Sequence, residues 1–100
     1  MSAPAPARLT AWVDGRVQGV GLRWWVRSRA LERGLAGFAE NLADGRVKVV
    51  AEGSRERCSE LLGLLSAEAS DSRPARPGRV TAVTHRWAEA AGGLSGFVER

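Results

Sequence analysis

The feature that most constrains the fold is an unbroken succession of strand, glycine-rich turn and helix in residues 8–33. Residues 8–14 alternate apolar and polar side chains, which predicts a strand with one buried face. Three glycines follow in residues 15–21, so the backbone can turn sharply there. Apolar residues then recur at every fourth position from 22 to 30. This spacing predicts a helix that begins at residue 22 or 23 and ends near residue 33, with Gly34 as its C-terminal cap.

The glycine-rich turn is a candidate anion-binding loop. Unpaired backbone N–H groups converge at a helix N-terminus, where the helix dipole adds partial positive charge. Arg23 falls at the start of the predicted helix, so its guanidinium could close over the same anion. The alternative is a glycine-rich connection beside a surface arginine, and this stretch alone leaves both interpretations open.

The remaining patterns alternate between strand and helix. They predict strands at 37–42 and 46–52, a helix from 55 to about 67, a strand at 79–87 and a short last strand at 94–99. Asp44-Gly45 is a hairpin turn signal, and the polar, proline-containing residues 70–78 predict an irregular connection.

This order predicts an α+β, ferredoxin-like split βαββαβ sandwich. Two helices would pack on one face of a four-stranded antiparallel sheet, with a possible short fifth strand. The first and third strands would lie at the centre. The loop after the first strand and the hairpin between the second and third strands would then face a common site.

Composition indicates a single domain. One hundred residues suffice for one core, so we expect a disordered leader at 1–7 and one domain at 8–100. No apolar run is long enough to span a membrane, and the single cysteine excludes an internal disulfide and favours the cytoplasm. That residue, Cys58, lies on the apolar face of the second predicted helix. We therefore expect its side chain to be buried and to pack as a small hydrophobic group. The net charge of +4 suits an anionic partner without specifying one.

Two separated motifs resemble those of the acylphosphatase family. They are GRVQGVGLR at residues 15–23 and GLAGFAEN at residues 34–41, followed by Asp44-Gly45, and the resemblance extends from about Arg8 to Phe97. It implies hydrolysis of the carboxyl–phosphate anhydride of a small-molecule acyl phosphate to carboxylate and inorganic phosphate, with no metal and no cofactor.

The resemblance also implies the site residues. Arg23 would bind the phosphate and Asn41 would orient the attacking water. The cradle would be the backbone amides of Val17, Gln18, Gly19, Val20, Gly21 and Leu22. This division is chemically coherent, because the carboxylate leaves without protonation and a neutral amide positions water without removing its proton. Charge stabilisation would then be the largest catalytic contribution.

Several residues have structural alternatives. Asn41 could be a turn residue that satisfies local backbone groups. His85 is the single histidine of the chain, and a structural or surface role is favoured for it over a catalytic one. Leu22 stands where the family often has phenylalanine, which should change packing under the loop. Glu40 would weaken anion binding unless it points to the other face of its strand. Of the adjacent Trp24 and Trp25, at least one should be partly exposed, because neighbours on a helix do not share a face.

Two other functions are compatible with this fold class. RNA-recognition domains have the same strand order, but they display aromatic residues on the third strand, and residues 46–52 contain none. A non-catalytic anion-binding domain would not need both Arg23 and Asn41. We therefore expect an enzyme that acts as a monomer without nucleic acid or membrane.

Overall fold

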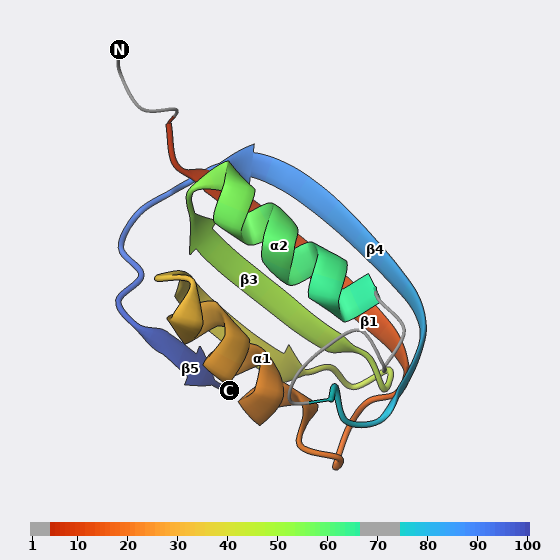
Figure 1. The fold of residues 1–100 in the computed structure, drawn as a ribbon. Coiled ribbons are helices and arrows are strands. Elements are labelled where there is room, and N and C mark those ends of the chain that lie inside the picture. The colour runs from red at the N-terminus through yellow and green to blue at the C-terminus, as the bar shows by residue number, and fades with distance from the viewer. Residues whose placement is uncertain (1–4, 67–74) are drawn as a thin grey trace.

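In the computed structural model, which describes residues 5–66 and 75–100, two helices cover one face of a five-stranded sheet (Figure 1). The elements in chain order are β1 (Ala7–Arg16), α1 (Leu22–Glu32), β2 (Ala36–Asn41), β3 (Val47–Gly53), α2 (Arg55–Ser66), β4 (Arg79–Glu89) and β5 (Phe97–Glu99). The predicted βαββαβ order is confirmed and a short fifth strand is present. The predicted helix end near residue 67 and residues 70–74 of the predicted connection lie outside the described residues.

The strands lie in the order β4-β1-β3-β2-β5, so β1 and β3 are internal as expected. All neighbours are antiparallel except β5, which runs parallel to β2. β1 begins one residue earlier than the sequence predicts, because Ala7 pairs with both Gly53 and Glu89. Of the predicted leader, residues 1–4 lie outside the described part of the chain.

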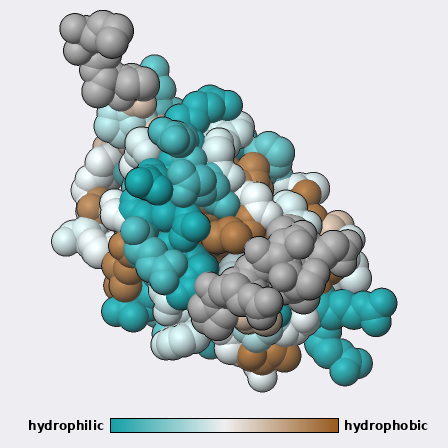
Figure 2. All heavy atoms as spheres, viewed as in Figure 1, coloured by the Kyte–Doolittle hydropathy of each residue, from teal (hydrophilic) through white to brown (hydrophobic). Residues whose placement is uncertain are grey.

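The core lies between the sheet and the two helices. Alternate residues of β1 face the helices and are fully buried, as the two-residue period of a strand requires. The largest buried side chains include Leu9 and Val13 from β1, Leu22, Trp25 and Val26 from α1, and Cys58, Leu61 and Leu65 from α2. Figure 2 shows the outer surface of this helix-covered face, which is largely hydrophilic with smaller hydrophobic patches.

Phe38 packs on the opposite side of the sheet. It pairs with Val50 across β2 and β3 and belongs to the face that carries no helix. Both side chains are nevertheless buried, and the Arg100 guanidinium lies 3.6 Å from the centre of the Phe38 ring. Phe38 is thus the bulky residue of its strand. It packs against the guanidinium of Arg100 and not against the two helices.

The turns predicted from local sequence signals are present in the structure. The N–H of Leu35 donates to the Ala30 carbonyl and the N–H of Gly34 to the Leu31 carbonyl, a Schellman motif that ends α1. At the β2–β3 hairpin the N–H of Arg46 donates to Oδ1 of Asp44 at 3.0 Å. Within residues 5–66 and 75–100, no helix is long and apolar enough to cross a membrane.

Candidate active site

The glycine-rich loop, residues 17–21, connects the end of β1 to the start of α1 (Figure 1). Val17 is buried in the core and Val20 packs against it, so two apolar side chains anchor the loop from below. Between and after these anchors, Gly19 and Gly21 adopt left-handed conformations that residues with side chains rarely adopt. Leu22, the next residue, is fully buried beneath the loop.

The N-terminus of α1 has no side-chain cap. Its N-cap residue is Gly21, and the first turn contains no acidic residue. In the described part of the chain, no backbone N–H of residues 17–22 donates a hydrogen bond within a turn, loop or cap. The first turn instead contains a cation, Arg23, which the helix dipole disfavours at this position. A bound anion would satisfy the N–H donors and offset the unfavourable charge.

Gln18 joins this loop to the β2–β3 hairpin. Its Nε2 donates to the carbonyl of Leu42 at 2.7 Å and to the carbonyl of Arg46 at 3.0 Å. These two carbonyls flank the hairpin turn, directly after Asn41. The loop and the strand end that carries Asn41 are therefore held side by side by one amide group. The sequence motif contains Gln18, but only the fold shows that its side chain makes this connection.

The Arg23 side chain lies toward the end of β2. Its Nη1 donates to the carbonyl of Arg100, and the N–H of Arg100 donates to the carbonyl of Ala39 at 2.8 Å. Ala39 precedes Asn41 by two residues on the same face of β2. Through these two hydrogen bonds, Arg100 connects the guanidinium of Arg23 to the strand end that carries Asn41. Sequence patterns gave no signal for the part played by Arg100, because it depends on β5 docking beside β2.

Asn41 is the last residue of β2 and is exposed. Within the described residues its side chain makes no hydrogen bond with the protein, whereas Asp44 bonds both the backbone and the guanidinium of Arg46. The backbone bond from Arg46, together with its side chain, lowers the pKa of the Asp44 carboxyl below its ordinary value. The turn is thus stabilised by Asp44, and the amide of Asn41 is left to face solvent. This favours a functional role for Asn41 over that of a turn residue.

Glu40 points away from this site. It pairs with Lys48 across β2 and β3, and alternation along β2 places it on the face without helices. Ala39, its neighbour on the helix side, is fully buried. Glu40 therefore points to the other face of its strand, which is the orientation in which it would not weaken anion binding.

The other singled-out residues lie apart from the loop. His85 is exposed in the middle of β4, where its ring makes an edge contact with Trp87. Cys58 is buried, and burial, with a smaller contribution from Glu52, raises the pKa of its thiol to about 11. Trp24 is exposed and Trp25 is buried, which agrees with the expectation that at least one of the two is partly exposed. The described residues contain no group of three or more His, Cys, Asp or Glu side chains able to hold a metal ion.

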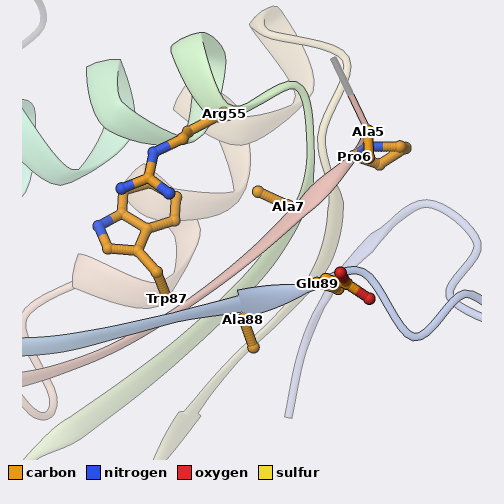
Figure 3. Close-up of a pocket in the computed structure, with 7 residues that line it drawn as sticks. All are labelled: Ala5, Pro6, Ala7, Arg55, Trp87, Ala88 and Glu89. Carbon is orange, nitrogen blue, oxygen red and sulfur yellow. The ribbon is translucent and has the colours of Figure 1, made fainter.

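A surface hollow of about 350 Å³ lies at the opposite end of β1 from the loop. Figure 3 shows that Arg55 and Trp87 point toward each other there, while Glu89 points away from them. The Arg55 guanidinium lies 4.3 Å from the centre of the Trp87 ring. This hollow contains none of the predicted site residues.

Comparison with known sequences supports the resemblance over most of the chain. A sequence model described as Acylphosphatase matches residues 9–99. An acylphosphatase of Acidothermus cellulolyticus is 65% identical over 92 residues, which cover 92% of this chain and 85% of that protein. An acylphosphatase of Mycobacterium sp. (strain JLS) is 61% identical over 100 residues, with 100% of both chains covered.

Solved structures show the same fold. The crystal structure of acylphosphatase from Bacillus subtilis is 30% identical and has a TM-score of 0.81, covering 94% of this chain and 98% of that one. An acylphosphatase structure from Coxiella burnetii is 32% identical and has a TM-score of 0.76, covering 96% and 94% of the two chains.

Proposed function

We propose that Arg23 and Asn41 divide the work of catalysis in this chain, which belongs to the acylphosphatase family and hydrolyses acyl phosphates. The observation that carries the proposal is the uncapped start of α1. Among the described residues, the backbone N–H groups of residues 17–22 donate no loop or cap hydrogen bond, and the side chain of Asn41 makes none with the protein. A first-turn cation, Arg23, lies beside these donors.

The phosphoryl group binds where the backbone N–H groups of Val17, Gln18, Gly19, Val20, Gly21 and Leu22 converge. Arg23 supplies a delocalised charge and paired N–H donors that match two phosphate oxygens. Its contact with the Arg100 carbonyl holds the guanidinium on the β2 side of the loop. These donors stabilise the charge that builds on the phosphate oxygens in the transition state.

Asn41 holds the attacking water by hydrogen bonds. The water oxygen bonds to phosphorus, the bond from phosphorus to the acyl oxygen breaks, and the carboxylate departs with the electron pair of that bond. The proton of the water passes to a phosphate oxygen, because a neutral amide is not a base at neutral pH. Asn41 therefore contributes position and not proton transfer.

The reaction needs no metal ion in this proposal. A carboxylate is a stable leaving group, so neither a general acid nor a Lewis acid is required at the acyl oxygen. The loop N–H groups and Arg23 provide the positive potential that a metal supplies in other phosphoryl-transfer sites.

Replacing Arg23 tests the phosphate-binding role. We expect Arg23→Ala to abolish hydrolysis of a generic aromatic acyl phosphate and binding of inorganic phosphate, with little change in thermal stability. Arg27→Ala is the matched control, because Arg27 lies one turn later on α1 and bonds the Phe97 carbonyl at 3.0 Å. Comparable turnover in Arg23→Ala and the wild type would contradict the proposal.

Replacing Asn41 separates water positioning from binding. Asn41→Ala should lower kcat by about 100- to 1,000-fold, the loss expected for one preorganised polar group. The inhibition constant of inorganic phosphate should stay unchanged, because Asn41 does not hold the phosphate. Loss of phosphate binding in a folded Asn41→Ala variant would show that Asn41 is structural.

We also expect residues 8–100 to act as a monomer in the cytoplasm, with a small acyl phosphate as substrate and neither nucleic acid nor membrane as partner. The absence of aromatic side chains from β3 supports the expectation about RNA. Light scattering on the purified protein measures the mass directly, and a dimer mass would refute the monomer.

A further inference from the structure

The segment Arg76–Gly78 contacts the glycine-rich loop from a part of the chain that the site motifs do not include. Gly78 lies so close to the loop that a Cβ atom there would be 2.4 Å from the Arg16 carbonyl oxygen and 2.8 Å from Cγ2 of Val20. Such distances are not tolerated, so any larger residue must displace one of these neighbours. Arg16 is the last residue of β1, immediately before the loop, and Val20 is one of the two apolar anchors of the loop.

The same crossing is tight on its other side. A Cβ atom at Gly15 would lie 2.1 Å from the carbonyl oxygen of Arg79, the first residue of β4. The register between β1 and β4 shifts between Asp14 and Gly15. The end of β1 and the beginning of β4 thus approach each other at two positions where only glycine fits, immediately before the loop.

Arg76 connects the same segment to helix α2. It is buried, and its Nη1 donates to the carbonyls of Leu64 and Leu65 at 2.8 and 2.9 Å. These carbonyls belong to the last turn of α2 that the structure describes. Arg76 therefore ties the segment to a rigid helix, two residues before Gly78 touches the loop.

We propose that Gly78 is a positioning residue for the glycine-rich loop and that Arg76 holds it in place. The segment supports Val20 from behind and so fixes the direction of the N–H groups that receive the phosphate. This role rests on the proposed function, because it affects catalysis only if the loop holds the phosphoryl group. Gly78 itself has no contact with the substrate.

A matched pair of alanine variants isolates the contact from backbone strain. Gly78 and Gly93 have φ angles of 78° and 80°, so alanine is strained at both positions. A Cβ atom at Gly93 meets nothing within 4 Å. Both variants should lose thermal stability, and Gly78→Ala should lose more, because its Cβ atom must also displace its neighbours. Only Gly78→Ala should also weaken phosphate binding.

The measured quantities are kcat and KM for an aromatic acyl phosphate and the inhibition constant of inorganic phosphate. We expect Gly78→Ala to raise KM and the phosphate constant by about tenfold or more, since a displacement of about 1 Å can cost about 100-fold. Gly93→Ala should keep wild-type constants. Equal constants in the two folded variants would overturn the positioning role.

A second variant covers the case in which Gly78→Ala does not fold. Arg76→Met removes the bonds to Leu64 and Leu65 but leaves Gly78 in place. It should raise the phosphate inhibition constant several-fold while the variant stays folded. Unchanged phosphate binding in a folded Arg76→Met variant would overturn the proposal.

Failure of the proposed function has a different signature. An inactive wild type that binds no inorganic phosphate would refute that function. An active wild type whose constants are shared by Gly78→Ala and Gly93→Ala would refute only the positioning role.

Discussion

The two helices begin in opposite ways. The start of α2 is capped by Ser54, whose Oγ accepts a hydrogen bond from the N–H of Arg57 at 3.1 Å, and Glu56 places a negative charge in the first turn. The start of α1 has Gly21 in place of a side-chain cap and Arg23 in place of an acidic residue. One N-terminal donor of α2 is satisfied by a side chain, whereas the start of α1 has no side-chain cap and is, in the proposed function, the place where the phosphate binds.

This difference shows that the start of α1 is the less stabilised of the two helix starts. A glycine N-cap such as Gly21 costs roughly a few tenths of a kcal/mol relative to a side-chain cap. The loss falls at the end of the sheet that carries Asn41 and Gln18, whereas the capped helix starts at the other end, beside Glu52. Substitutions that make the two starts more alike are therefore direct tests of the site.

The largest effect is expected from giving α1 a charged cap. Gly21→Asp places a carboxylate among the N–H donors of the loop, where a phosphoryl group binds in the proposed mechanism. Repulsion between two charges about 4 Å apart is worth about 1–4 kcal/mol, so phosphate binding should weaken by about 10- to 1,000-fold. Inhibition by inorganic phosphate measures the loss.

Gly21→Asn is the matched control, because it adds a side chain of the same size without charge and asparagine tolerates the left-handed conformation at Gly21. A smaller loss in Gly21→Asn than in Gly21→Asp identifies charge as the cause. Equal inhibition constants for inorganic phosphate in the wild type and Gly21→Asp would contradict phosphate binding at the start of α1.

Removing the cap of α2 should change stability alone. Ser54→Ala leaves the N–H of Arg57 without its acceptor and should lower the free energy of unfolding by about 1 kcal/mol. The values of kcat and KM should remain those of the wild type. Urea denaturation and the acyl phosphate assay on the same sample measure both, and a change in KM would link α2 to the site.

Acid should weaken the α2 end of the sheet. Burial alone would raise the pKa of Glu52, but bonds from the N–H groups of Ala91 and Gly92 and from Arg8 hold that pKa below its ordinary value of 4.5. Because the folded-state pKa is lowered, the stability from Glu52 is complete above about pH 4.5 and declines as pH falls further.

The difference in urea midpoint between the wild type and Glu52→Gln should therefore be largest near pH 7 and shrink below about pH 4.5. Glu89→Gln, which removes an exposed carboxylate from β4, is the control. A difference that does not depend on pH would show that the charge of Glu52 contributes nothing.

The smallest expected effect is none at all. A chelator such as EDTA should leave kcat and KM unchanged, because Arg23 and the loop N–H groups supply the positive potential at the phosphate in the proposed mechanism. Activity that falls with chelator and returns with added Mg²⁺ would contradict this mechanism.

Local signals account for most of what the sequence predicted. Glycines, Asp44-Gly45 and the apolar periods each depend on nearby residues, so they located the loop, the hairpin and both helices. The residues Arg23 and Asn41 came from a family motif. What the sequence did not reveal are the contacts between distant segments.

Three such contacts shape the site. Gln18 bonds the hairpin, Arg23 bonds the carbonyl of Arg100, and Gly78 lies against Val20. Each depends on strand order and register, which a single sequence specifies only through the packing of the whole chain. For the same reason the pattern around Phe38 indicated a large strand residue without indicating which face it occupies.

The position of β1 inside the sheet has a consequence for how the chain reaches this structure. Residue 8 pairs with residue 52 on one side and with residue 88 on the other, so the first strand has no local partner. Closing such long loops must precede most of the stabilising contacts, which slows folding relative to proteins built from local pairs. During synthesis the first strand therefore waits for β4, which begins only at Arg79, before it is paired on both edges.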